Sequence, residues 1–126
     1  MVLPSSLPIG TMEMSSGPKP WEVWHARFDY SGKSGYKYRP VVVVDVYPDG
    51  TLAMMVTSVS NKLSLPYDYQ IEDWEGAGLE KRSIARADRI ATLPANYFGT
   101  AGKIGRLSDR DIAALEAILS AIDDEG

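Results

Sequence analysis

An arginine and a carboxylate, Arg86 and Asp88, stand two residues apart in a segment of β-type composition between residues 82 and 90. Side chains at positions i and i+2 of a strand point to the same face, so we expect the two to project together. A carboxylate can accept a proton, and a guanidinium can hold a phosphate through its planar fork of N–H donors. The pair therefore indicates chemistry on a phosphodiester.

RNA brings its own nucleophile to such a site. Its 2′-hydroxyl attacks the adjacent phosphate once a base accepts the hydroxyl proton, and the protein then supplies position and electric field. In this scheme Asp88 accepts the proton and Arg86 stabilises the charge that develops on the phosphate, since a guanidinium donates no proton itself. The spacing alone fits an exposed salt bridge better than a catalytic pair, because such ion pairs are common and contribute little energy.

Two further polar positions stand at the ends of apolar runs. Arg39 precedes Pro40 and four valines, where a cation beside a polar loop can meet a phosphate; a solvated arginine at a strand end explains it equally well. Thr57, followed by Ser58, closes the next apolar run. The Thr57 hydroxyl can bond a phosphate oxygen or satisfy the strand backbone, and the sequence favours the second alternative.

Other kinds of active site find little support in the sequence. The chain has one histidine, His25, and no cysteine, and it contains neither an HExxH motif nor clustered metal-binding carboxylates. A Gly-x-Ser-x-Gly motif and glycine-rich phosphate-binding loops are also absent from the sequence. We therefore expect no metal and no cofactor, and interpret His25 as an ordinary strand residue.

The net charge of −4 opposes an interaction with RNA, which a basic protein would favour. Between Arg27 and Arg106, however, basic residues are at least as frequent as acidic ones, so a positive groove is compatible with the total. Tyr36 and Tyr38 are the best-placed aromatic side chains for stacking on unpaired bases, with a role in the core or in a dimer contact as the alternative for the aromatic residues. The residues that we expect to contact RNA are Lys33, Tyr36, Lys37, Tyr38, Ser58, Lys62, Arg82 and Arg89.

The elements that must position these residues are mostly short strands. Alternating side chains over 21–28 predict a half-buried strand with Trp24, Ala26 and Phe28 on its core face. The valine run at 40–44 predicts a strand buried on both faces. Further segments expected as strands are 52–56 after a Pro-Asp-Gly turn, 67–71, 83–92 and 103–107, and one helical turn is expected over 94–98.

The period of the apolar residues changes from two to that of a helix after Ser108. Ser108 and Asp111 form a predicted capping pair. The apolar stripe that follows consists of Ile112, Leu115, Ile118, Leu119 and Ile122. We predict a mainly β fold with α: a small SH3-like, partly open β-barrel covered by one C-terminal amphipathic helix.

The domain organisation follows from composition and length. Residues 1–20 are rich in proline, serine and glycine and predict a flexible arm, 21–122 a single domain, and 123–126 an acidic tail. No apolar stretch is long enough to span a bilayer, and the N-terminus lacks the pattern of a secretory signal. We expect a cytoplasmic protein without membrane contact.

The ordered set Arg39-Pro40, Thr57-Ser58 and Arg86-Ala87-Asp88, followed by Gly105 to Ser108 before a helix, resembles the MazF/PemK family of toxins from bacterial toxin–antitoxin pairs. The resemblance extends over roughly 21–119. It implies the SH3-like fold and a ribosome-independent, metal-independent endoribonuclease that cuts single-stranded mRNA at a short sequence and leaves a 2′,3′-cyclic phosphate. It also implies a homodimer with RNA in a shared groove and inhibition by a cognate antitoxin.

The two branches of that family imply different catalytic pairs. The PemK branch implies Arg86 and Asp88, whereas the MazF branch implies Arg39 and Thr57, and both pairs stay candidates. This chain departs from the family at 32–35, where its loop has no histidine or glutamate. Two alternatives to a nuclease are a CcdB-like topoisomerase inhibitor, which would act through the C-terminal helix near Asp109, Arg110 and Glu116, and a catalytically silent RNA- or protein-binding module.

Overall fold

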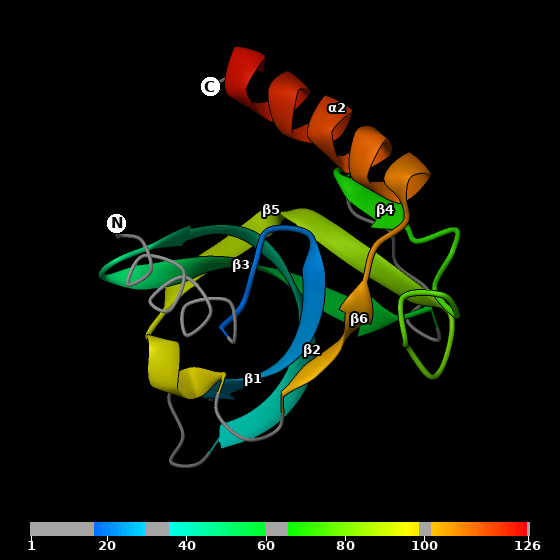
Figure 1. The fold of residues 1–126 in the computed structure, drawn as a ribbon. Coiled ribbons are helices and arrows are strands. Elements are labelled where there is room, and N and C mark those ends of the chain that lie inside the picture. Colours follow the sequence, from blue (N-terminus) through cyan, green and yellow to red (C-terminus); the bar gives the residue numbers. More distant parts are fainter. Residues whose placement is uncertain (1–16, 30–35, 60–65, 99–101, 126) are drawn as a thin grey trace, which may run out of the picture.

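The computed structural model of the chain describes residues 17–29, 36–59, 66–98 and 102–125. A six-stranded antiparallel sheet curls on itself without closing, and a long C-terminal helix lies across one end (Figure 1). The elements are β1 (Glu22–Asp29), β2 (Tyr36–Tyr47), β3 (Gly50–Ser58), β4 (Asp68–Gln70), β5 (Ser83–Leu93), the 3₁₀ turn η1 (Ala95–Tyr97), β6 (Lys103–Arg106) and α2 (Asp109–Glu125). This architecture confirms the predicted fold class.

The strand order is β4-β5-β3-β2-β1-β6, so the centre of the sheet is formed by neighbours in sequence. The turn at 48–49 joins β2 to β3, and Tyr47 pairs with Gly50 across it. Val41, Val42 and Val43 are all fully buried, which confirms the predicted burial of the valine run on both faces. Each face of the sheet therefore has its own hydrophobic core.

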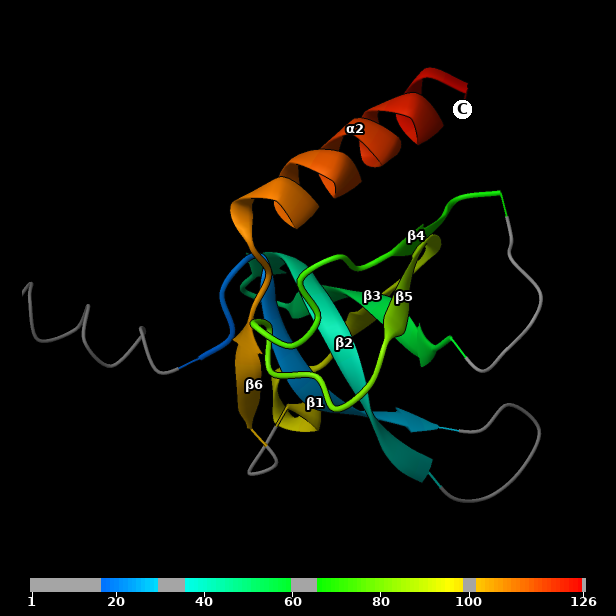
Figure 2. The ribbon, with the colours of Figure 1, turned by 90° about the vertical axis from the view of Figure 1, so that its right-hand side faces the viewer.

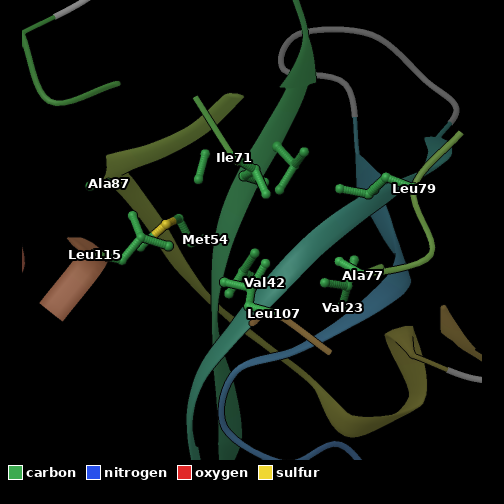
Figure 3. Close-up of a cluster of buried hydrophobic side chains, with 11 residues drawn as sticks. Val23, Val42, Met54, Ile71, Ala77, Leu79, Ala87, Leu107 and Leu115 are labelled. Atoms are coloured by element: carbon green, nitrogen blue, oxygen red, sulfur yellow. The ribbon is translucent and has the colours of Figure 1, made fainter. Parts of the chain in front are cut away.

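The first core lies between the sheet, the segment after β4 and the helix (Figure 3). Val42 and Met54 face it from adjacent central strands, and Leu115 of α2 covers them from the other side. The apolar stripe of the helix packs here as predicted, with Ile112, Ile118, Leu119 and Ile122 partly buried against the core. Burial of this stripe, rather than helix propensity, holds α2 on the sheet.

The second core lies on the opposite face and is covered by the residues around η1. Its members include Trp24, Ala26 and Phe98, and the rings of Trp24 and Phe98 meet edge to face at 6.1 Å between centroids. Trp24 and Ala26 are therefore buried as predicted, but Val23 on the other face of β1 is fully buried too. Both faces of β1 therefore pack against a core, and the predicted single core face is incomplete. The side chain of Phe28 lies outside the described residues.

A buried carboxylate fixes the N-terminus of α2. Asp111 accepts hydrogen bonds from the Tyr69 hydroxyl and from the backbone N–H groups of Glu72 (3.0 Å) and Asp73 (2.9 Å). The predicted capping pair is present, since the Asp111 N–H donates to the Ser108 hydroxyl at 3.3 Å. Burial and the bond to Asp111 raise the pKa of the Tyr69 phenol far above its ordinary range, so it stays a donor. One side chain thereby joins the helix to the segment that follows β4.

A second carboxylate completes this junction at the surface. Asp73 accepts two hydrogen bonds from the Arg110 guanidinium, each 2.8 Å long, and one from the Ser108 hydroxyl. Such a two-point pair is geometrically specific and stronger than a single neutral hydrogen bond. We call Asp73, Ser108, Arg110 and Asp111 with Tyr69 the helix junction.

Several boundaries differ from the sequence expectation. Strands β2 and β3 extend at both ends beyond the expected 40–44 and 52–56, and the helix and β4 differ as well. The helix continues to Glu125, so residues 123–125, expected to be a tail, form its last turn. Strand β4 is limited to Asp68–Gln70, because the chain then turns toward the helix junction instead of continuing along β5. In the described ranges, no helix has the length and apolar character needed to cross a membrane. The expected arm at 1–20 lies largely outside the described residues.

Replacing Asp111 by alanine is expected to lower the free energy of unfolding by about 3 kcal/mol, because three donors lose their acceptor at once. Urea unfolding measures the change. Asp109→Ala is the matched control, since this residue lies in the same helical turn with an almost fully exposed side chain, and a change within about 0.5 kcal/mol is expected. Equal effects of the two substitutions would contradict the role of the junction.

The junction also predicts an acid-dependent loss of stability. The hydrogen bonds from Arg110 and Ser108 lower the pKa of the Asp73 carboxyl to about 2. A lowered pKa in the folded state contributes stability above the unfolded-state value of about 3.9, and this contribution is lost as the pH falls from about 4 to about 2. We expect the difference in Tm between the wild type and Asp73→Asn to be largest near pH 7 and to shrink toward pH 2. A difference that stays constant would rule out this linkage.

Candidate active site

A cavity of about 330 Å³ opens on the sheet where β1, β2 and β3 meet the start of β5. Its polar lining consists of His25, Arg39, Thr57, Ser58, Glu80, Lys81 and Ser83. Pro40, Val56, Leu79 and Ile104 supply its apolar surface. The cavity thus combines cations, hydroxyls, one carboxylate and the single imidazole of the chain in one place.

Antiparallel pairing of β2 and β3 brings Arg39 and Thr57 to this cavity from positions 18 residues apart in the sequence. Val41 pairs with Met55. Arg39 lies two residues before Val41 and Thr57 two residues after Met55, so both lie on the same side of this pair in the antiparallel ladder. Both side chains are partly exposed. A guanidinium and a hydroxyl at one cavity can both donate hydrogen bonds to phosphate oxygens.

The remaining wall belongs to residues 71–82, which we call the β4–β5 segment. Figure 2 shows that it runs toward β6 before it returns to β5. Where the segment approaches β6, Gly78 has a φ angle of +92°. A Cβ atom at this position would lie 2.5 Å from the Ile104 carbonyl oxygen. A Cβ atom on Gly105 would lie 2.1 Å from the Ala77 carbonyl oxygen. Two glycines thus permit the backbone contact that places the next residues, 79–81, at the cavity.

The sequence predicts no site role for four polar groups of the cavity, which are His25, Glu80, Lys81 and Ser83. Glu80 and Lys81 were not considered, and His25 was interpreted as an ordinary strand residue. His25 does lie on β1, but it also lines the cavity. The available signal was the Gly-Ala-Gly triplet at 76–78, which indicates close backbone approach just before Glu80 and Lys81.

The structure places Arg86 and Asp88 differently from the expected pair. The side chain of Arg86 is only 13% exposed and forms an ion pair with Asp68 of β4 at 3.8 Å. Asp88 is exposed. The pairing of β3 with β5 jumps from Met55–Arg86 to Met54–Ile90, so residues 87–89 form a bulge. A bulge breaks the alternation from which a shared face was expected, and neither residue lines the cavity.

The residues expected to contact RNA are spread over several places. Ser58 lines the cavity, whereas Arg82 lines a second, smaller cavity beside it. Tyr38, next to Arg39, is 45% exposed, and Arg89 is exposed in the β5 bulge.

Four of the expected RNA contacts are not placed by the structure. Lys33 and Lys62 lie outside the described residues, as does the loop at 32–35. Tyr36 and Lys37 are part of β2, but only their backbone is described. Of the cations expected to contact RNA, the structure describes the side chains of Arg82 and Arg89, and neither lines the cavity that contains Arg39.

The nearby charges have clear structural roles. Burial favours the neutral form of Glu22, but hydrogen bonds from Trp24 (2.8 Å), Lys103 and the Lys19 N–H outweigh it and lower the pKa of this carboxyl. The ion pair of Glu22 with Lys103 thus links β1 to β6. Arg110, which a topoisomerase inhibitor would present on the helix face, is 64% exposed and also bonds Asp73. Within the described ranges, no three histidine, aspartate or glutamate side chains come together as a metal site.

The fold is shared with solved structures of low sequence identity. An endoribonuclease from mycobacterial species is 14% identical with a TM-score of 0.62, over 83% of this chain and 89% of that one. The Mycobacterium tuberculosis toxin MazF-mt6 is 19% identical with a TM-score of 0.60, over 82% and 96%. A MazE–MazF crystal structure from Deinococcus radiodurans matches at 15% identity and 0.63, over 83% and 94%. The fold is therefore MazF-like.

A family model assigns the chain more directly. The PemK-like, MazF-like toxins of type II toxin–antitoxin systems match over residues 19–122. The chain belongs to this family, which confirms the resemblance found in the sequence. A comparison with curated protein sequences finds no match.

The contact between the β4–β5 segment and β6 can be tested by adding one carbon atom. Gly105→Ala is expected to lower the free energy of unfolding by about 2 kcal/mol or more, because its Cβ meets the backbone of Ala77 rather than a movable side chain. Gly76→Ala is the control, since the nearest atom to its Cβ is the Asp73 carbonyl oxygen at 3.7 Å. Similar unfolding curves for both variants would show that the segment is not tightly packed there.

Proposed function

We propose that the protein is the toxin of a type II toxin–antitoxin system and acts as a metal-independent, sequence-specific endoribonuclease on single-stranded RNA. The observation that carries this proposal is the presence of Arg39 and Thr57 at one cavity with further polar groups. These are the two residues that the MazF branch of the family implies as critical. Membership of the family and its fold support the same conclusion.

The cavity residues divide the work of phosphodiester cleavage. Arg39 binds the scissile phosphate and offsets the negative charge that grows on its oxygens. Thr57 donates a hydrogen bond to the same phosphate and fixes its orientation. Exposed Tyr38 is available to stack on an adjacent base. The positive charges of Arg39 and Lys81 exceed the single charge of Glu80, which suits an anionic substrate.

The reaction needs no nucleophile from the protein. The 2′-oxygen forms a bond to phosphorus while the bond from phosphorus to the 5′-oxygen breaks. The 2′-hydroxyl proton passes to a base, and an acid protonates the leaving 5′-oxygen, which gives a 2′,3′-cyclic phosphate and a 5′-hydroxyl. The imidazole of His25 and the carboxylate of Glu80 are the cavity groups suited to these transfers. In this assignment Arg86 supports the sheet through Asp68, and Asp88 has no direct part.

The biological setting follows from the same family. We propose a cytoplasmic homodimer whose activity a cognate antitoxin blocks by covering Arg39 with acidic side chains. A MazE–MazF structure among the similar folds supports a protein partner of this kind. The overall charge of −4 should slow the approach of an acidic antitoxin, so we expect association to be faster at moderate than at very low salt.

Purified protein incubated with a long single-stranded RNA in EDTA tests the proposal. We expect discrete cuts with cyclic-phosphate ends, and a decrease in kcat/KM of roughly 10²–10³-fold for Arg39→Ala, because a positioned charge on the developing oxyanion is lost. Thr57→Val is expected to act in the same direction. Arg106→Gln is the control, since it removes an exposed arginine of β6 outside the cavity and should cut like the wild type.

The choice between catalytic pairs depends on the same assay. Cleavage that survives Asp88→Asn but not Thr57→Val would support the cavity around Arg39. The opposite pattern would assign catalysis to Arg86 and Asp88. RNA that stays intact over many sequences would overturn the nuclease.

A further inference from the structure

A second cavity of about 290 Å³ lies near the start of β5. It is lined by Gln70, Ile71, Glu72, Trp74 and Arg82, and none of these residues has a part in the proposed cleavage. Lys81 and Ser83 line the first cavity and Arg82 the second, so adjacent residues of the chain separate the two. We propose, on the basis of the proposed nuclease function, that this second cavity binds the base of a nucleotide flanking the cut.

The lining has the groups that a single-stranded base requires. Trp74 is partly exposed and offers an aromatic ring for stacking, which is how proteins hold unpaired bases. Gln70 and Glu72 are exposed polar side chains that can bond the edge of the base, and Arg82 supplies a cation for the phosphate.

The ring of Trp74 is held in place before any ligand arrives. It packs against the first core, and the Trp74 carbonyl accepts the Leu79 N–H at 3.1 Å. The two preceding residues, Glu72 and Asp73, donate their backbone N–H groups to Asp111. The helix junction therefore orders one wall of the cavity, which reduces the entropy lost when a base binds.

The two cavities lie at the ends of neighbouring strands. The Val59 N–H bonds the Arg82 carbonyl at 3.1 Å, and the Ile71 N–H bonds the Ser83 carbonyl at 3.0 Å. Strand β5 thus begins between the end of β3 and the end of β4, and neighbouring strands lie about 4.8 Å apart. Two such spacings separate the backbone of Ser58, which lines the first cavity, from that of Ile71, which lines the second. This distance is short enough for neighbouring nucleotides of one RNA strand to reach both.

The carboxylate of Glu72 predicts which base is preferred. A carboxylate only accepts hydrogen bonds, so it favours bases whose edge carries an amino group. It disfavours uracil, whose single edge donor, N3–H, stands between two carbonyl oxygens that repel a carboxylate. The cavity should therefore select adenine, cytosine or guanine over uracil at one position beside the cut. Glutamine in place of Glu72 would both donate and accept, and would weaken this selection.

Mapping of cut sites on a random single-stranded RNA pool in EDTA tests the subsite. Glu72→Gln is expected to increase the relative use of uracil at one flanking position by roughly tenfold, with the cut position and the other preferences unchanged. Glu75→Gln is the matched control, because it removes an exposed carboxylate of the same segment outside the cavity. Identical maps for the wild type and both variants would overturn the subsite while leaving the nuclease intact.

Stacking is tested separately, at the level of rate. Trp74→Ala should lower kcat/KM by roughly 5- to 100-fold, as expected for loss of one stacked base, and Trp74→Phe should retain most of the activity. Because Trp74 also packs against the core, Gln70→Ala serves as a second variant at an exposed position and should change the same flanking preference. Full activity of Trp74→Ala, or equal losses in the alanine and phenylalanine variants, would count against stacking.

A binding measurement separates failure of the subsite from failure of the nuclease. If the wild type cuts no RNA, the anisotropy of a labelled single-stranded RNA pool reports binding without cleavage. Weaker binding by Trp74→Ala than by Trp74→Phe would then support the subsite in a protein that binds RNA without cutting it. Equal binding by both variants and the wild type would reject it.

Discussion

The carboxylate of Asp111 joins two parts of the chain that the sheet alone would leave apart. It lies in the first turn of the C-terminal helix and accepts hydrogen bonds from the backbone N–H groups of Glu72 and Asp73 after β4. A buried carboxylate without hydrogen-bond donors is energetically costly. The Asp111 carboxylate and the N–H groups of Glu72 and Asp73 therefore fix one another's positions. The β4–β5 segment therefore starts from a fixed point, and the position of everything it carries depends on that contact.

The same segment ends at the candidate active site. From the helix junction it reaches β6, where Gly78 and Gly105 allow backbone to approach backbone, and it then lines both cavities on its way to β5. The central strands β2 and β3 contribute Arg39 and Thr57. The site thus combines residues set by strand pairing with residues set by a segment that is fixed at both ends.

The acidic total charge has a structural explanation that is consistent with an anionic substrate. Asp73, Asp111 and Glu22 are each engaged by internal donors, and the acidic residues at 123–125 lie on the last turn of the helix. The cations of the first cavity are offset there by a single carboxylate, that of Glu80. Local potential at the site, rather than the sum over the chain, governs how a phosphate is received.

The sequence by itself determined the class of fold, the doubly buried valine strand and the capped helix, because these depend on local patterns of burial. It offered Arg39 and Thr57 as candidates only through the resemblance of its ordered motifs to a known family. Only the tertiary structure decided that Arg86 pairs with Asp68, since a bulge in β5 cancels the alternation that a regular strand would have. It also decided that His25, Glu80 and Lys81 line the same cavity as Arg39. Contacts between segments distant in sequence depend on the curl of the sheet and on the path of the β4–β5 segment. The spacing of residues within one segment does not determine either of them.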